Sequence, residues 1–171
     1  MIYIDLDGVL ADLEAYMIQK SPAAAEREFD FFGLAFSDKR FFLDSPVIES
    51  GYELLEEIRS QGRDYRILSS LPCLGRFYEH ALKHYYAPDK VQKIYAQFAD
   101  NKIEWCKRLG IPAENVILVN STSEKIRYCQ SPEDILYDDR EAICKEWIAK
   151  GGQAKLVAYE SRRQEYIGES K

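Results

Sequence analysis

Two carboxylates near the start of the chain follow an apolar run, where buried acids are energetically unfavourable unless they bind a partner or a ligand. Asp5 and Asp7 end the apolar run that begins at Met1, in the sequence MIYIDLDGVLAD, and Gly8 follows at once. This run is short and rich in β-branched and aromatic residues, which favours a buried strand of a parallel sheet. Glycine allows a sharp turn or a close approach to a ligand. We therefore expect a reactive acidic pair at the carboxyl end of a strand, where ligands bind in open α/β sheets.

Other apolar runs along the chain also end in polar side chains. Each run precedes a segment with helical spacing, so the runs are expected to be parallel strands whose carboxyl ends meet at one edge. The polar residues at or near these ends are Ser69, Ser70, Lys125, Asp138 and Asp139. We expect all of them to converge on Asp5 and Asp7.

Four carboxylates gathered at one edge repel one another. At a separation of about 5 Å and an effective dielectric of about 20, each charged pair costs on the order of 3 kcal/mol. A divalent cation offsets this repulsion, and ligands that are all oxygen select a hard ion. Mg²⁺ takes a few carboxylates together with waters and a substrate phosphate. We therefore expect Mg²⁺ at this edge, with a phosphoryl substrate beside Ser69, Ser70 and Lys125.

Strands and helices that alternate along the chain must position these residues. The strands are expected near residues 1–6, 65–68, 116–119, 134–137 and 154–158. Each connection is long enough for a crossover, which predicts an α/β fold, a Rossmann-like three-layer sandwich with a mostly parallel sheet. Residues 13–46 lack a strand signal and contain many aromatic residues. We expect them to form a small helical cap inserted after the first strand, between core segments 1–12 and 47–171.

Local signals predict where several helices begin. Residues 9–16 carry helical spacing directly after the first strand. Ser50 and Glu53 have the spacing of a capping box, and Asp100 can cap a helix that continues through Trp105. The segment 87–98 stays open between a loop, a short helix and an edge hairpin.

Composition and charge limit the class of partner. The 171 residues carry a net charge of -6, which argues against polymeric nucleic acid, because such binding depends on Lys and Arg. No apolar run approaches the length of a membrane span, and the first acid arrives too early for a signal segment, so we expect no membrane partner and a cytoplasmic location. The four cysteines form no CxxC pair, which is typical of reduced structural thiols. A homodimer stays open.

Two further groups have both a functional and a structural interpretation. His80 and His84 lie four residues apart on an expected helix, a spacing that can bind zinc. The sequence provides no HExxH glutamate and no third ligand beside them, so surface histidines are the simpler interpretation. The phenylalanines of residues 29–42 could stack on a nucleobase or form the core of the cap, and both interpretations stay open.

The polar clusters resemble the four motifs of the haloacid dehalogenase superfamily of phosphotransferases. DLDGV at residues 5–9, ILSS at residues 67–70, Lys125 and ILYDD at residues 135–139 resemble motifs one to four in order. Within that superfamily the chain is most similar to the 5'(3')-deoxyribonucleotidase and phage-type 5'-nucleotidase group. The segments that carry this similarity are RFFLDSPVIESGYELLEEI, KIEWCKRLGI and EKIRYCQSPEDILYDDREAICKEWIAKGG.

This resemblance implies a catalytic role for residues of each motif. Asp5 would attack phosphorus and form an aspartyl-phosphate intermediate. Asp7 would be the general acid and then the general base. Ser69 and Ser70 would bind the phosphoryl oxygens, and Lys125 would neutralise the charge that grows on them.

The same resemblance implies a metal ion and a substrate class. Mg²⁺ would be held by Asp5, the Asp7 carbonyl and Asp139, with Asp138 as an alternate ligand or a partner behind the direct ligands. The expected activity is Mg²⁺-dependent hydrolysis of a small phosphomonoester, a nucleoside or deoxynucleoside monophosphate, by a phosphoric monoester hydrolase. The cap would shape the substrate pocket.

Three alternatives stay open beside this interpretation. One is a phosphatase of the same superfamily for another small phosphoester or for a polynucleotide 3'-phosphate. Another is a receiver-like phosphoacceptor, which also uses an Asp, Mg²⁺, a hydroxyl and a Lys on a doubly wound sheet. A receiver would need no cap, whereas here an insertion follows the first strand. The last is an inactive nucleotide-binding module.

Overall fold

A five-stranded parallel sheet forms the centre of the molecule. The computed structural model describes residues 1–25, 30–84 and 86–157. The strand order is β3-β2-β1-β4-β5, with β1 in the middle and every neighbouring pair parallel. The strands are β1 (Ile2–Ile4), β2 (Tyr65–Ser70), β3 (Val116–Val119), β4 (Ile135–Asp138) and β5 (Gln153–Leu156). The sheet confirms the predicted Rossmann-like α/β class.

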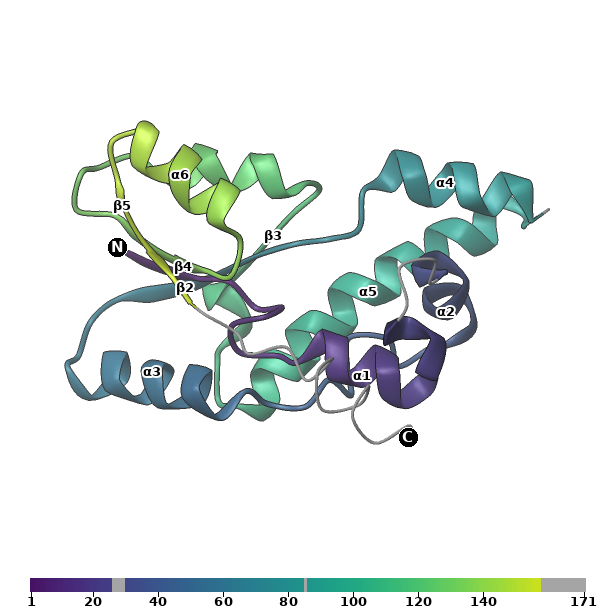
Figure 1. Ribbon diagram of the computed structural model, residues 1–171, viewed down its shortest axis with the longest axis horizontal. Helices are drawn as coiled ribbons and strands as arrows, with labels where there is room; N and C mark the ends of the chain where they lie inside the picture. Colours follow the sequence, from purple (N-terminus) through teal and green to yellow (C-terminus); the bar gives the residue numbers. More distant parts are fainter. Residues whose placement is uncertain (26–29, 85, 158–171) are drawn as a thin grey trace.

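Helices cover both faces of this sheet, which gives three layers (Figure 1). The helices are α1 (Leu13–Lys20), α2 (Phe31–Ser37), α3 (Glu49–Ser60), α4 (Leu74–Lys83), α5 (Pro88–Arg108) and α6 (Glu141–Ala149), with 3-10 turns η1 (Pro22–Ala25), η2 (Ala113–Asn115) and η3 (Thr122–Tyr128). Leu55 of α3 and Trp105 of α5 pack with Ile4 on one face. Trp147 of α6 packs with Leu68 and Leu136 on the other face. Burial of such side chains stabilises the fold by about 1.5 to 3 kcal/mol each.

An aromatic cluster forms a second core beyond the carboxyl edge of the sheet. Helices α1 and α2 of the insertion contribute Tyr16 and Phe36, and the ring of Phe36 stacks on Phe77 of α4 at a centroid distance of 4.4 Å. Phe98 of α5 belongs to the same cluster. The insertion therefore packs on α4 and on the first half of α5 rather than standing apart.

The two ends of the insertion lie side by side. Ala11 and Val47 form an antiparallel bridge. The Asp12 amide donates to the Pro46 carbonyl at 2.8 Å, and the Ile48 amide donates to the Leu10 carbonyl at 2.8 Å. The chain therefore leaves the core and returns to it at one place.

Two predicted helix starts near the insertion are wrong. The carbonyl of Leu6 accepts the amides of Leu10 and Ala11 at 2.9 and 2.8 Å, so the chain after β1 turns tightly, and α1 begins only after its cap Asp12. The predicted capping box at Ser50 does not form either. Helix α3 begins at Glu49 with Ile48 as its cap residue and without a side-chain cap.

The segment from residue 88 to residue 108 is one continuous helix, α5. Pro88 lies at its first turn, where a missing amide costs nothing, and Gly110 follows its end. The predicted helix start at Asp100 is therefore wrong, because that residue lies inside α5 and the open segment 87–98 is helical apart from its first residue. In the part of the chain that the structure describes, no helix is long and apolar enough to cross a membrane. The four cysteines are free thiols.

Candidate active site at the carboxyl edge of the sheet

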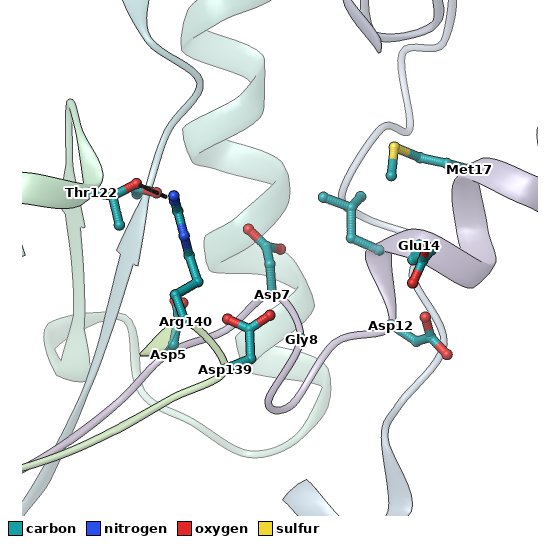
Figure 2. Close-up of a pocket in the computed structure, with 11 residues that line it drawn as sticks. Asp5, Asp7, Gly8, Asp12, Glu14, Met17, Thr122, Asp139 and Arg140 are labelled. Atoms are coloured by element: carbon teal, nitrogen blue, oxygen red, sulfur yellow. Dashed lines mark hydrogen bonds between the residues drawn. The ribbon is translucent and has the colours of Figure 1, made fainter. Parts of the chain in front are cut away.

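A pocket of about 270 Å³ opens at the carboxyl ends of the central strands. Figure 2 shows the acids that follow β1 and β4 on one side of this pocket and the residues of α1 on the other. The lining residues are Asp5, Asp7, Gly8, Asp12, Leu13, Glu14, Met17, Ser70, Thr122, Asp139 and Arg140. The structure therefore brings residues at or after the ends of β1, β2, β3 and β4 to one place, beside the first helix of the insertion.

Lys125 lies buried between two acids of this edge. Its Nζ is 2.6 Å from Asp5 Oδ2 and 2.8 Å from Asp138 Oδ2, and the lysine is 0% exposed. Burial opposes its charge, but the two carboxylates outweigh this effect and raise the pKa of Lys125. The lysine is therefore a fixed cation that compensates Asp5 and Asp138 from behind the pocket wall.

The two adjacent acids after β4 have different surroundings. Asp138 is 0% exposed, and its second oxygen accepts the Arg140 amide at 2.9 Å. Asp139 is more accessible and faces the pocket. Burial, with the charges of Asp5 and Asp138, raises the pKa of Asp139 to about 7. Among the described residues, no lysine or arginine forms an ion pair with Asp139, whereas Asp5 and Asp138 both pair with Lys125.

Three carboxylates of this edge could hold a metal ion together. One oxygen each from Asp5, Asp138 and Asp139 lies within 4.8 Å of the others. An all-oxygen donor set of this kind suits a hard ion such as Mg²⁺. Asp5 and Asp139 line the pocket, whereas Asp138 does not and accepts bonds from Lys125 and from the Arg140 amide, so the pair Asp5 and Asp139 is better placed to meet an ion from the pocket.

Gly8 leaves room for the carboxylate of Asp139. Its φ is +80°, a conformation that side chains with a Cβ rarely adopt, and a Cβ at this position would collide with Asp139 Oδ2. Glycine is therefore required here by the backbone and by the neighbouring acid at once.

A second buried lysine, which the sequence analysis missed, reaches the site from α5. Lys102 Nζ contacts the Asp7 carboxylate, and it donates to Ser69 Oγ and to the Ser70 carbonyl, both at 2.9 Å. It also lies 4.4 Å from the centroid of the Phe42 ring. Burial raises the pKa of Asp7, whereas the charge of Lys102 opposes this rise and that of Asp5 adds to it. Lys102 therefore links Asp7, which follows β1, to Ser69 and Ser70 at the end of β2.

The two serines of the second motif are placed differently. Ser69 is 0% exposed and accepts the bond from Lys102, whereas Ser70 lines the pocket. Ser70 Oγ lies 3.4 Å from Thr122 Oγ1. The hydroxyl that can reach a ligand in this structure is therefore that of Ser70.

Arg140 adds a positive charge at the mouth of the pocket. Neither Arg140 nor Thr122 is among the site residues predicted from the sequence. Arg140 Nη1 donates to Thr122 Oγ1 at 2.9 Å, as Figure 2 shows. Arg140 directly follows the DD pair, so its place after a strand end was the available signal. Together with Ser70, these side chains give the pocket a set of donors beside its acids.

Comparison of the chain with protein-family models and with curated proteins finds no match. The chemistry of the pocket must therefore be argued from its own residues.

Proposed function

We propose that the chain is a Mg²⁺-dependent phosphatase of small phosphomonoesters that works through an aspartyl-phosphate at Asp5. The observation that carries the proposal is the meeting of Asp5, Asp7 and Asp139 at one pocket, with two buried lysines compensating them. Acids alone would suit a cation, but acids, cations and hydroxyls together suit a phosphoryl group bound beside a cation.

The carboxylates of Asp5 and Asp139, with the Asp7 carbonyl, are the atoms proposed to hold Mg²⁺. The proposal is supported by the close approach of the carboxylate oxygens and by the absence of a Cβ at Gly8. When bound, Mg²⁺ would offset the negative charge of these acids and of the substrate phosphate.

In the first half-reaction, a carboxylate oxygen of Asp5 forms a bond to phosphorus. The bond from phosphorus to the ester oxygen breaks, and Asp7 donates a proton to that oxygen, so that a neutral alcohol leaves. The raised pKa of Asp7 favours the protonated form needed at this stage. Lys125 holds Asp5 in place and compensates its charge in the resting state.

In the second half-reaction, a water molecule attacks the phosphorus of the aspartyl-phosphate. Asp7, now a carboxylate, accepts the proton of this water while the bond from phosphorus to the Asp5 oxygen breaks. Inorganic phosphate is released, and both acids return to their starting forms. Ser70 and Arg140 are the donors that line the pocket for the phosphoryl oxygens.

A nucleoside monophosphate is the proposed substrate class. This proposal rests on the motif resemblance, and the structure adds an apolar wall of Leu13 and Met17 from α1 that a nucleoside could contact. Among the described residues, none of the phenylalanines between positions 31 and 42 lines the pocket, because they pack in the aromatic cluster. Phe29 lies outside the described residues. Base stacking on these rings is therefore no part of the proposal.

Phosphate release from a substrate panel tests the proposal. The panel comprises 5' and 3' nucleoside and deoxynucleoside monophosphates, sugar phosphates and an oligonucleotide with a 3'-phosphate. We expect activity on a nucleotide that EDTA abolishes and that Asp5→Asn lowers by at least about 1,000-fold. Asp64→Asn, an exposed acid just before β2, is the matched control and should retain activity.

Two outcomes would contradict this proposal. Activity that survives Asp5→Asn would remove Asp5 as the nucleophile, and activity in excess EDTA would remove the metal. A phosphorylated chain that persists without turnover would favour the receiver-like alternative.

A further inference from the structure

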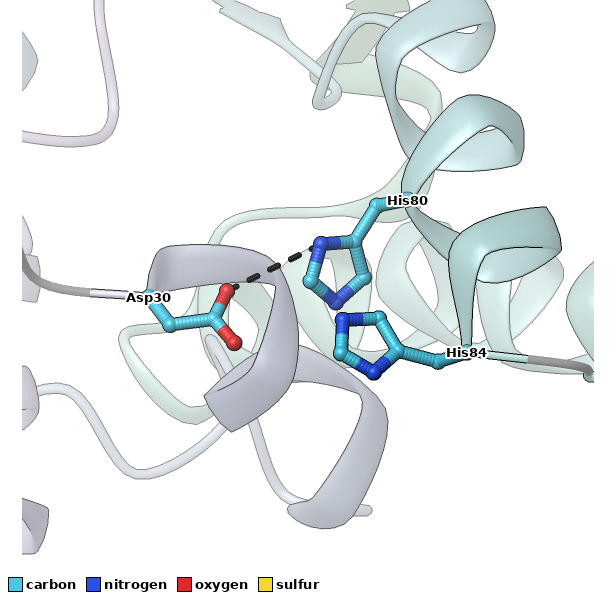
Figure 3. Close-up of side chains that lie close together, drawn as sticks. All are labelled: Asp30, His80 and His84. Atoms are coloured by element: carbon cyan, nitrogen blue, oxygen red, sulfur yellow. Dashed lines mark ion pairs between the residues drawn. The ribbon is translucent and has the colours of Figure 1, made fainter.

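Two histidines and an aspartate meet at the far side of the aromatic cluster, away from the acidic pocket. His80 lies in the last turn of α4 and His84 caps its end, whereas Asp30 is the cap residue of α2 (Figure 3). One ligand atom from each of the three side chains lies within 4.8 Å of the others. We propose that Asp30, His80 and His84 bind a zinc ion.

The ligand types favour zinc over the magnesium proposed for the other site. Two histidines at positions i and i+4 lie on one face of a helix, a spacing that chelates Zn²⁺. Imidazole nitrogen suits Zn²⁺, Cu²⁺ or Ni²⁺, whereas Mg²⁺ requires oxygen ligands. Two nitrogens and one carboxylate oxygen leave the fourth tetrahedral position for water. The two proposed ions are therefore separated by chemistry as well as by place.

The carboxylate of Asp30 is held in position before any ion binds. Its Oδ1 accepts the amide of Gly33 at 2.9 Å, and Oδ1 is 3.8 Å from Nδ1 of His80. A Cβ on Gly33 would collide with Asp30 Oδ2, so this glycine leaves the space that the second oxygen occupies. The acid therefore faces the histidines as part of the structure that begins α2.

The imidazole of His80 is also held by its neighbours. Its ring lies 5.6 Å from Phe32 and 5.8 Å from Phe36, centroid to centroid, and 4.4 Å from the ring of His84. His80 is partly buried, whereas His84 and Asp30 are exposed. One ligand is thus fixed against the aromatic cluster, and two can adjust from the solvent side to complete the coordination.

The sequence alone does not identify a third ligand beside His80 and His84. Asp30 comes from the insertion, fifty residues before His80, so spacing along the chain could not provide it. The ion would join α2 to α4, the two helices whose aromatic rings already stack. Since an ion that binds only the folded chain stabilises it, we expect zinc to raise the melting temperature of the protein.

Binding of Co²⁺ as a spectroscopic substitute for zinc tests the proposal on the full chain without a histidine tag. The sequence contains two histidines, and both belong to this cluster, so a signal from histidine coordination reports on it directly. We expect intense visible bands of four-coordinate Co²⁺ that Zn²⁺ abolishes by displacement and Mg²⁺ does not. Zinc affinity is measured by calorimetry on the same samples.

Four variants distinguish loss of the proposed zinc ligands from other effects. His84→Gln and Asp30→Asn should each weaken zinc binding at least tenfold, and Asn can still cap α2 because its side chain also accepts an amide. Lys83→Gln, an exposed neighbour on α4, is the matched control and should bind as the unaltered chain does. Asp139→Asn should also keep the zinc site, which separates it from the acidic pocket.

The proposal is overturned if the unaltered chain gives no four-coordinate spectrum, or if His84→Gln binds zinc with unchanged affinity. It is also overturned if Asp139→Asn, rather than His84→Gln, abolishes binding, since the ion would then lie among the acids. Equal melting temperatures of the variants in EDTA would show that a lost signal reflects lost ligands. If His84→Gln melts at a lower temperature than the unaltered chain in EDTA, His84→Asn is used in its place. Its zinc affinity should likewise be at least tenfold weaker.

Discussion

Lys102 Nζ contacts the carboxylate of Asp7 across 95 positions of the sequence. The lysine is 0% exposed, and its other two bonds go to Ser69 Oγ and the Ser70 carbonyl. Its charge therefore has no solvent to compensate it, and the position of α5 fixes where the Asp7 carboxylate lies. The acid that gives and then takes a proton in the proposed mechanism is thus held by a cation from another part of the chain.

Replacing Lys102 should lower the rate of phosphate release by more than any loss of folded protein accounts for. Lys102→Met keeps the length and apolar stem of the side chain but leaves Asp7 without its partner. We expect kcat/KM for phosphate release to fall by about 100-fold or more, the scale on which a preorganised charged donor contributes. Lys107→Met, an exposed lysine on the same helix, is the control. Activity of Lys102→Met within a few-fold of the unaltered chain would contradict the role of the ion pair.

The adjacent acids Asp138 and Asp139 should respond differently to the same substitution. Asp138→Asn removes one of the two charges that compensate buried Lys125, so we expect the free energy of unfolding to fall by about 3 kcal/mol with or without Mg²⁺. Asp139→Asn should leave the metal-free protein intact but abolish the rise in melting temperature on adding Mg²⁺. Chemical denaturation and thermal melts distinguish the two. If Asp138→Asn, rather than Asp139→Asn, abolished the rise in melting temperature on adding Mg²⁺, Asp138 would be the direct metal ligand.

A methyl group at position 8 should disturb both the turn and the acid beside it. Gly8→Ala places a Cβ against Asp139 and forces alanine to a φ of +80°. We expect a loss of at least about 1 to 2 kcal/mol in unfolding free energy, with weaker Mg²⁺ binding by calorimetry. Gly75→Ala is the control, because Gly75 lies within α4 and, apart from its chain neighbours and the backbone of α4 itself, no atom of the described residues lies within 4 Å of the added carbon. That variant should be as stable as the unaltered chain or slightly more stable.

The raised pKa of Asp139 predicts how the metal-free protein responds to pH. The folded chain holds a proton on Asp139 up to a pKa of about 7, whereas its ordinary value is 3.8. The folded state therefore binds more protons than the unfolded state between these values, so stability should fall as pH rises from about 5 to 7. Melting temperatures in EDTA test this slope, and Asp139→Asn should flatten it. A slope that is the same in both proteins would assign the titration to another group.

Much of the fold follows from local pattern, because buried parallel strands and their polar ends leave a clear signal. Four apolar runs that end in polar residues, with a fifth predicted strand near the end of the chain, predict the α/β class, and the observed sheet confirms it. Helix starts were harder to predict. The capping-box spacing at Ser50 is not used, since the chain enters α3 directly from the pairing of Ile48 with Leu10. Such entry geometry depends on tertiary contacts that spacing does not encode.

Lys102 and Asp30, which contact site residues from distant parts of the chain, could not be predicted from the sequence. Lys102 lies one helical turn from Phe98 and from Cys106, both buried, so a lysine on an apolar face was the available signal. It could be used only if residues 88–108 were known to be one helix. Asp30 gave no signal at all, because its relation to His80 arises from the packing of two helices. Contacts between elements distant in sequence decide such sites.

The pairing of Ala11 with Val47 has a consequence for how this architecture can vary. Because the outgoing and returning segments of the chain already pair there, the sheet, its acids and Lys125 could persist if the residues between them were exchanged for a segment of different length or shape. Among the described residues, the aromatic contacts of this segment with α4 and α5 would have to be remade. Under the proposed function, substrate choice and reaction chemistry could thus change independently, one through the exchanged segment and the other through residues that the exchange leaves in place.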